Sequence, residues 1–177
     1  FTVPAPPTVS LTCPVNTTTT ACLTQAQINT AFSAWLATAS ASGGCNGVLS
    51  NNNTGAPTVC VGGSTTVTFT YTSSCAPFTT TYQATFTVPT PAAVILTCPV
   101  NTTTAACKTQ AEINTAFAAW LATATASGGC SSSLTNNNTG APSSCGGSTT
   151  VTFTYTSSCA PFTSSCQATF TVPQDAT

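Results

Sequence analysis

Cysteines are the side chains of this 177-residue sequence that could most readily do chemistry, since there are eleven of them. Charged partners for them are scarce, because one Lys+Arg, two Asp+Glu and no His leave only Lys108, Glu112 and Asp175. General acid–base catalysis needs a titratable group beside its substrate, and a Ser or Cys nucleophile needs a neighbouring base. The sequence offers no such arrangement, so we expect a protein that is not an enzyme and has no catalytic residue.

The composition also argues against metals, cofactors and nucleic acids as ligands. Zinc sites use clusters of Cys, His or carboxylate, and calcium usually takes several carboxylate oxygens. Only the cysteines could contribute here, and they form no CxxC pair. A net charge of −1 offers nothing to phosphates. We therefore expect no metal, no cofactor and no nucleic-acid partner.

The same cysteines indicate a cellular compartment. A small chain that is rich in Thr, Ser and Cys and nearly uncharged is typical of disulfide-stapled extracellular domains. No stretch approaches the ~20 apolar residues of a membrane span, and no signal peptide is present. We expect an extracellular or cell-surface location without a membrane span, with the targeting information outside this segment.

The elements that must position the cysteines occur twice. Residues 62–79 recur letter for letter as residues 146–163, and the opening Phe-Thr-Val-Pro recurs where each repeat closes. We interpret 1–6 as the tail strand and linker of a preceding repeat, 7–89 as repeat 1 and 90–177 as repeat 2. The chain would then be a window in a longer tandem array. Short Pro-rich linkers predict an end-to-end arrangement of neighbouring units.

Alternation of apolar and polar residues predicts the strands. Val67, Phe69 and Tyr71 alternate with threonines, which is typical of a half-buried strand, and residues 83–88 repeat the pattern as its hairpin partner. The polar tract 16–20 is either an edge strand or a loop.

One helix is expected in each repeat. Thr24 and Gln27 match a capping box, and Thr109 and Glu112 repeat it. Apolar residues follow at helical spacing, so we interpret the tryptophan in each stripe, Trp35 or Trp120, as a core residue. Together the patterns predict a mainly β fold of two tandem β-sandwich modules, each with one inserted amphipathic α-helix.

Two polar surfaces could bind a ligand. Residues 51–57 and 136–142 are dense in turn formers and read as loops. Their asparagines offer a polar contact surface for sugars: Asn51, Asn52, Asn53, Asn136, Asn137 and Asn138. The threonine row of the main strand could instead face a polysaccharide or ice, although Thr is also a good strand former.

Pairing of the cysteines is partly constrained by strand geometry. The second repeat has six disulfide candidates: Cys98, Cys107, Cys130, Cys145, Cys159 and Cys166. The first has Cys13, Cys22, Cys45, Cys60 and Cys75, because Tyr82 stands where Cys166 would be. Cys60 and Cys75 flank a strand that separates them by roughly 25 Å, against the ~5.5 Å that a disulfide needs. We favour Cys159 with Cys166, the main rival being Cys98 with Cys166; the favoured pairing leaves Cys75 unpaired.

Several motifs together carry a family resemblance. They are Leu-Thr-Cys-Pro, Ala-Trp-Leu-Ala-Thr-Ala, Asn-Asn-Asn-Thr-Gly-Ala-Pro and the duplicated strand with its Ser-Ser-Cys-Ala-Pro-Phe ending. The set resembles the tandem repeats of SprB-like gliding-motility cell-surface adhesins of Bacteroidota, and the final hairpin resembles HYR-like, immunoglobulin-type (Ig-like) modules. Tyr82 departs from the six-cysteine pattern, which affects the disulfide set expected for the first repeat.

The resemblance implies a long extracellular filament that is exported by the type IX secretion system. Its implied partners are neighbouring repeats of the same chain, the secretion and gliding machinery, and a surface polysaccharide. We therefore expect a disulfide-stapled stalk segment that acts in surface adhesion and gliding motility. The alternative is a polysaccharide-binding or ice-binding module that uses the threonine rows or the asparagine loops.

Overall fold

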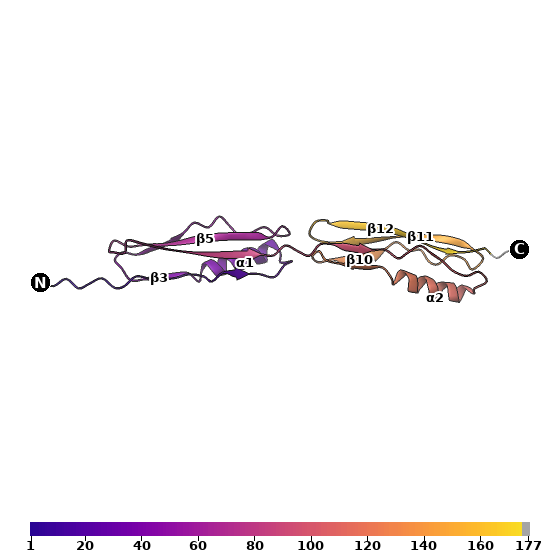
Figure 1. Ribbon diagram of the computed structural model, residues 1–177, viewed down its shortest axis with the longest axis horizontal. Coiled ribbons are helices and arrows are strands. Elements are labelled where there is room, and N and C mark those ends of the chain that lie inside the picture. The colour runs from indigo at the N-terminus through magenta and orange to yellow at the C-terminus, as the bar shows by residue number, and fades with distance from the viewer. Residues whose placement is uncertain (175–177) are drawn as a thin grey trace. The chain divides into compact units, whose positions relative to one another are not determined.

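The computed structural model describes residues 1–174, so Asp175 lies outside the described part of the chain. The chain divides into two compact units, Phe1–Pro91 and Ala92–Thr177. Each unit is mainly β with one helix, and the order of elements is the same in both (Figure 1).

The elements of the two units correspond one to one. The first unit contains β1 (Ser10–Thr12), β2 (Thr17–Thr18), α1 (Gln25–Leu36), β3 (Ser40–Ser42), β4 (Val48–Asn51), β5 (Gly63–Thr72) and β6 (Thr79–Val88). The second contains β7 (Ile95–Thr97), β8 (Thr102–Thr103), α2 (Gln110–Leu121), β9 (Thr125–Ser127), β10 (Ser133–Asn136), β11 (Gly147–Thr156) and β12 (Thr163–Val172). The predicted helix and terminal hairpin are confirmed in each unit.

The main sheet of each unit has four strands, in the order β2-β6-β5-β4 or β8-β12-β11-β10. β5 and β6 form a long antiparallel hairpin, in which Gly63 lies opposite Val88 and Thr72 opposite Thr79. β2 runs parallel to β6 at the edge of the sheet. The polar tract 16–20 therefore contains an edge strand, Thr17–Thr18, and this second strand of the unit is the neighbour of the last.

The core lies between this sheet and the helix, because alternate residues of β5 and β6 point to one side. Val67 and Phe69 are fully buried there against Ile28 of α1. The ring of Trp35 lies 5.6 Å from that of Phe86. The interpretation of the tryptophans as core residues is confirmed: Trp35 and Trp120 are each 6% exposed. Each unit also has a separate two-stranded sheet, β1 with β3 or β7 with β9.

Both helices begin as the sequence predicts. Thr24 accepts a hydrogen bond from the amide of Gln27, and the Gln27 side chain accepts one from the amide of Thr24 at 2.9 Å. In α2 the carboxylate of Glu112 accepts from the amide of Thr109 at 2.8 Å. Hydrogen bonds from the Thr109 amide and hydroxyl, together with the charge of Lys108, lower the pKa of the exposed Glu112 carboxyl.

Candidate functional site

The asparagine side chains of the asparagine loops mainly accept hydrogen bonds from backbone amides. Asn51 Oδ1 accepts from the amide of Asn53 at 3.2 Å, and Asn53 Oδ1 accepts from the amide of Gly55 at 3.2 Å. Asn52 Oδ1 reaches the neighbouring strand and accepts from the amide of Thr68 at 2.8 Å. Residues 52–57 form a loop as predicted, whereas Asn51 is the last residue of β4.

The loop of the second unit is built in the same way. Asn136 Oδ1 accepts from the amide of Asn138 at 3.2 Å, and Asn137 Oδ1 accepts from the amide of Thr152 at 2.8 Å. Because these carboxamide oxygens already accept backbone hydrogen bonds, their first role is to fix the loop. Contact between the asparagines and sugars remains a prediction.

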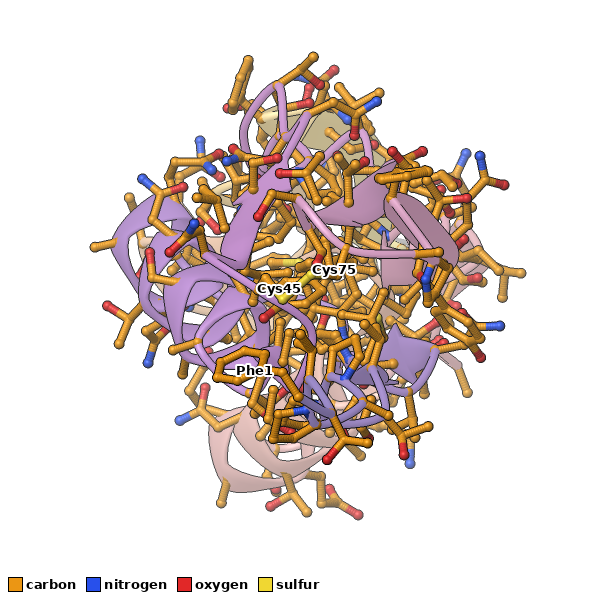
Figure 2. The ribbon with its side chains drawn as sticks, turned by 90° about the vertical axis from the view of Figure 1, so that its left-hand side faces the viewer. Phe1, Cys45 and Cys75 are labelled. Atoms are coloured by element: carbon orange, nitrogen blue, oxygen red, sulfur yellow. A yellow bond between two sulfur atoms is a disulfide. The ribbon has the colours of Figure 1, made fainter. Side chains whose placement is uncertain are left out.

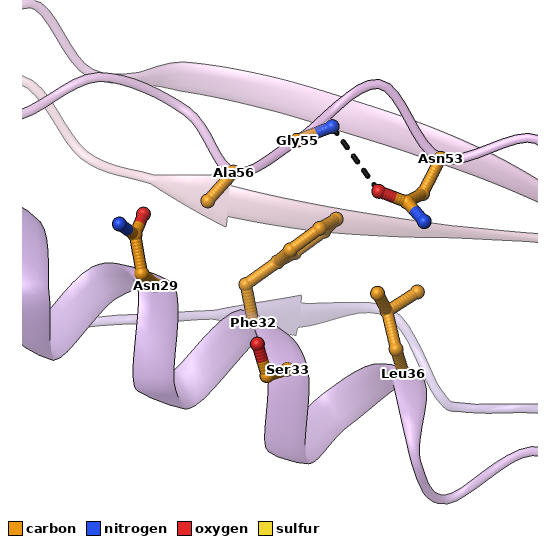
Figure 3. Close-up of a pocket in the computed structure, with 7 residues that line it drawn as sticks. All are labelled: Asn29, Phe32, Ser33, Leu36, Asn53, Gly55 and Ala56. Atoms are coloured by element: carbon orange, nitrogen blue, oxygen red, sulfur yellow. Dashed lines mark hydrogen bonds between the residues drawn. The ribbon is translucent and has the colours of Figure 1, made fainter.

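A hollow of about 440 Å³ lies between α1 and the asparagine loop of the first unit (Figure 3). It is lined by Asn29, Phe32, Ser33, Leu36, Asn53, Gly55 and Ala56. The Phe32 ring is only 4% exposed, so it offers no open face for a sugar to stack on. The Asn29 side chain accepts from Gln25 Nε2 at 2.9 Å, which occupies part of its hydrogen-bonding capacity. The hollow thus has a polar rim without an aromatic platform.

The threonine rows face away from the core and bond to one another. The hydroxyls of Thr66 and Thr85 lie 2.9 Å apart across β5 and β6, and Gln83 Nε2 donates to Thr68 Oγ1 at 3.1 Å. The second unit repeats the first contact. Such cross-strand pairs stabilise a hairpin by roughly 0.2–1 kcal/mol each. Strand pairing therefore explains the threonine rows without a ligand.

Eight cysteines are disulfide-bonded: Cys22, Cys45, Cys60, Cys75, Cys98, Cys130, Cys159 and Cys166. Cys45 bonds Cys75 with Cα atoms 5.3 Å apart, and Figure 2 shows this bond within the first unit. Cys98 bonds Cys166 with Cα atoms 6.1 Å apart. The predicted exclusion of Cys60 with Cys75 is confirmed.

Two disulfide predictions are wrong. Cys166 pairs with Cys98 rather than with Cys159, and Cys75 is bonded rather than unpaired. The reason is the register of the hairpin: Cys166 lies within β12 opposite Phe153, whereas Cys159 lies in the turn before β12 begins. Cys166 is therefore on the core side of the sheet, where the segment between β7 and β8 passes.

The thiol that is free in the first unit is Cys13, at the position that Cys98 holds in the second. Its expected partner position is occupied by Tyr82, which lies opposite Phe69 as Cys166 lies opposite Phe153. Cys13 is half-buried against the core, and this burial raises the pKa of its thiol. Cys145 of the second unit is also a free thiol and is exposed.

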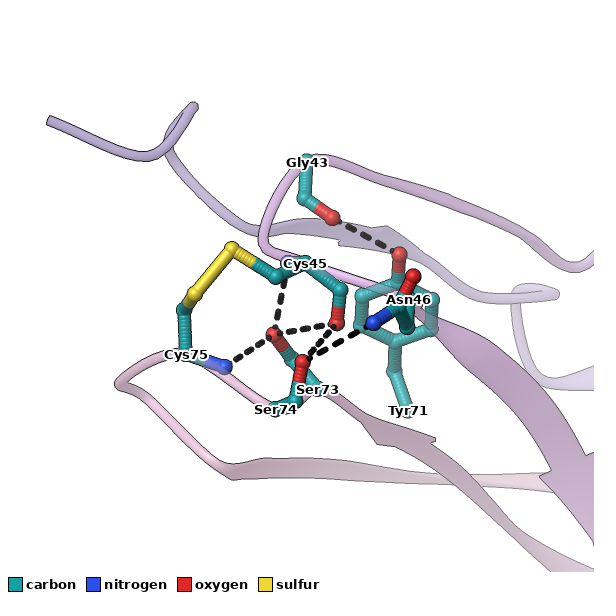
Figure 4. Close-up of a disulfide and its surroundings, with 7 residues drawn as sticks. All are labelled: Gly43, Cys45, Asn46, Tyr71, Ser73, Ser74 and Cys75. Carbon is teal, nitrogen blue, oxygen red and sulfur yellow. Dashed lines mark hydrogen bonds between the residues drawn. A yellow bond between two sulfur atoms is a disulfide. The ribbon is translucent and has the colours of Figure 1, made fainter. Parts of the chain in front are cut away.

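A buried serine organises the Cys45–Cys75 bond (Figure 4). Ser73 Oγ accepts from the amide of Cys45 at 2.9 Å and from the amide of Cys75 at 3.1 Å. Ser157 makes the same two contacts with the amides of Cys130 and Cys159. Because the serine is only 8% exposed, these amides have no ready replacement acceptor in water.

The second and last strands of each unit meet in what we call the terminal clamp, defined as residues 16–19 with 85–87 and residues 101–104 with 169–171. Beyond the paired residues of β2, the amide of Thr19 donates to the carbonyl of Thr87 at 2.9 Å. Asn16 Oδ1 extends the pairing by accepting from the amide of Thr85 at 2.9 Å. Sequence reasoning missed this role of Asn16, because its only signal is an asparagine placed just before a two-residue strand.

In the second unit a disulfide reinforces the clamp. Cys98 precedes β8 (Thr102–Thr103), and Cys166 precedes Phe170, which lies opposite Thr102. Each cysteine therefore lies four residues before its paired strand residue. The bond runs alongside the hydrogen bonds of the clamp and joins the same two segments.

Within residues 1–174, no helix is long and apolar enough to cross a membrane. The same part of the chain contains no group of three or more His, Cys, Asp or Glu side chains that could hold a metal ion. No known family model matches the sequence, and no curated protein matches it significantly.

Proposed function

We propose that each unit is a load-bearing structural repeat of an extracellular adhesin, built as an Ig-like sandwich module. The observation that carries this proposal is that the terminal clamp and the Cys98–Cys166 bond join the segment after the first strand of a unit to its last strand.

Parallel pairing of the second strand with the last suits a unit that is pulled by its ends. β2 is approached from its N-terminal side and β6 is left at its C-terminal side, so tension moves the two strands in opposite directions along their length. All hydrogen bonds of the clamp are then loaded together. An antiparallel arrangement would instead open them one after another.

The Cys98–Cys166 disulfide of the second unit limits how far the unit can extend under tension. Cys98 and Cys166 are 68 residues apart in sequence, and tension applied outside them passes through the S–S bond. The core between Ile113 and Val151 lies within this closed segment and would carry little load. Such a unit holds its shape when pulled, which is what a stalk requires.

Adhesion and gliding motility enter the proposal through the resemblance to SprB-like repeats. Disulfides fit an extracellular location, since they persist in oxidising environments. The alternative, binding of polysaccharide or ice, has weaker support. The threonine hydroxyls are bonded across the hairpin, and the hollow beside α1 has no open aromatic face.

Force spectroscopy of the chain held at both ends tests the proposal through Thr19. Thr19→Pro removes the amide that donates to Thr87, so the first unit should yield at a lower force. Thr19→Ala keeps this amide and, like the proline variant, loses the long 3.5 Å contact of the Thr19 hydroxyl with the Thr87 carbonyl, so it is the matched control and should yield at close to the natural force. Equal unfolding forces for Pro and Ala would contradict a load-bearing clamp.

Binding assays test the competing function on the same chain. A structural repeat should bind no polysaccharide on a glycan array and should not slow ice recrystallisation. Specific binding that is lost on replacing Asn53 or Thr66 would favour the alternative instead.

A further inference from the structure

We propose that Cys107 and Cys145 are a dithiol that closes to a disulfide on oxidation and joins the start of α2 to the loop before β11. This inference concerns a covalent modification site of the second unit and does not depend on the load-bearing role. It is carried by the equivalence of the two units at four places: the backbone before the helix, the glutamine of its first turn, the loop that this glutamine holds and the cysteines themselves.

The backbone that presents the first cysteine is the same in both units. Cys22 has a φ of 67° and Cys107 a φ of 60°, and each stands two residues before the threonine that caps its helix. A left-handed conformation is uncommon for residues other than glycine, so its recurrence shows that the local structure is shared. Cys22 corresponds to Cys107, and Cys60 corresponds to Cys145. In the first unit both Cys22 and Cys60 are disulfide-bonded.

In the first unit, a glutamine in the first turn of α1 holds the loop that contains Cys60 close to Cys22. Gln25 Oε1 accepts from the amide of Val59 at 2.8 Å, and Gln25 Nε2 donates to the carbonyl of Pro57 at 3.2 Å. Val59 is the residue directly before Cys60, and Gln25 follows Cys22 by three residues. The contact therefore brings the two cysteine-bearing segments together.

The second unit keeps this contact. Gln110 Oε1 accepts from the amide of Ser144 at 2.9 Å, and Gln110 Nε2 donates to the carbonyl of Pro142 at 3.1 Å. Ser144 directly precedes Cys145, as Val59 precedes Cys60. The loop with Cys145 is thus tied to the first turn of α2, three residues after Cys107.

The units differ in the turn that follows. The second unit lacks a counterpart of Val61, and there the amide of Cys145 donates to Ser143 Oγ at 3.2 Å. This turn is on the surface, and it is followed by Gly146 and Gly147, both with positive φ. Two consecutive glycines allow the backbone of the turn to change conformation at a low cost in free energy. The Cys145 sulfur can therefore move toward Cys107.

Closure is a thiol–disulfide exchange with an oxidant that itself contains a disulfide. The exposed Cys145 thiolate attacks one sulfur of the oxidant, which forms a mixed disulfide and releases one thiol. The Cys107 thiolate then attacks the Cys145 sulfur and releases the second thiol of the oxidant. Two electrons and two protons pass from the protein to the oxidant, which ends as a dithiol or as two thiols.

Mass spectrometry of the whole chain after incubation with oxidised glutathione tests the proposal. The chain is denatured in the presence of an alkylating reagent without reduction and is then digested. We expect a peptide pair linked through Cys107 and Cys145, with Cys13 as the alkylated cysteine. Alkyl label on both Cys107 and Cys145, while Cys22 and Cys60 stay protected, would overturn the proposal.

Two variants test whether Cys107 pairs with Cys145 and whether the natural turn allows it. Cys145→Ser should make Cys107 accessible to alkylation, whereas continued protection of Cys107 would show that it pairs elsewhere and would refute the proposal. Insertion of a valine after Cys145 restores the loop length of the first unit. If the bridge forms only in this insertion variant, the natural turn prevents closure and the inference fails.

Discussion

Replacing Tyr82 with cysteine should create in the first unit the bridge that closes the terminal clamp of the second. Cys13 already stands at the position of Cys98, and its thiol is free. Tyr82 lies opposite Phe69 in the register that places Cys166 opposite Phe153. The backbone therefore presents position 82 to Cys13 much as Cys166 is presented to Cys98.

The expected gain in stability follows from the length of chain that the new bridge would close. Cys13 and Tyr82 are 69 residues apart, for which loop-closure entropy gives about 4 kcal/mol. The Cys45–Cys75 bond already restricts part of this segment, which reduces the gain to about 3 kcal/mol. Tyr82 is 54% exposed, so its removal costs about 1 kcal/mol or less. A net gain of about 2 kcal/mol corresponds to a rise in Tm of about 8–16 °C for a unit of this size.

Calorimetry of the whole chain, with mass spectrometry to verify the bridge, measures this effect. Tyr82→Ser removes the ring without adding a thiol and should not raise the transition of the first unit. Cys166→Tyr gives the second unit the arrangement of the first and should lower its transition by a similar amount. If Tyr82→Cys forms the bridge and the transition does not rise, the account of the missing cross-link is wrong.

Three further substitutions test other parts of the structure. Ser73→Ala leaves two amides beside the Cys45–Cys75 bond without an acceptor and should cost about 1–3 kcal/mol in urea denaturation; a loss below about 0.5 kcal/mol would contradict its central role. Trp35→Phe leaves the Val15 carbonyl without its 2.8 Å donor and opens space in the core, so a loss of about 2–4 kcal/mol is expected by the same method, and a neutral result would refute it. Glu112→Gln should abolish a pH dependence, because a carboxyl with a lowered pKa stabilises the folded state above its ordinary value of 4.5 and loses that effect as pH falls through the folded pKa. Calorimetry in acid should show the second unit losing stability in the natural chain and not in this variant; equal acid sensitivity would exclude the carboxyl as the cause.

Local sequence patterns predicted the elements whose structure is decided by neighbouring residues. The alternation around Phe69 predicts β5, and the capping box at Thr24 predicts the first residue of α1. Trp35 falls on the apolar stripe of that helix and is buried as expected. In each case a few neighbouring residues decide the outcome, so no knowledge of distant segments is needed.

Long-range pairing could not be predicted in the same way. Whether Cys166 bonds Cys98 or Cys159 depends on which segment lies beside β12, and nothing local to Cys166 records this. β2 has only two paired residues, too few for a periodic pattern. The role of Asn16 is likewise visible only once β2 is placed against β6.

The candidate ligand surfaces show a second limit of sequence reasoning. Asn52 and Thr66 have the composition of a polar contact surface, but their side chains bond to neighbouring strands. Exposed polar residues in a β protein can serve the fold as readily as a ligand. The sequence contains no signal that separates these uses.

The most direct test of the load-bearing account is the length that the second unit releases when the chain is stretched by its ends with disulfides intact. The bridge should confine extension to the six Cα-to-Cα steps from Ala92 to Cys98 and the seven from Cys166 to Pro173. At ~3.5 Å per residue these segments span about 45 Å when fully extended. Reduction, or Cys166→Tyr in reduced protein, should allow the whole unit to extend to about 280 Å. Release of the full length from the second unit while its disulfides are intact would contradict the account.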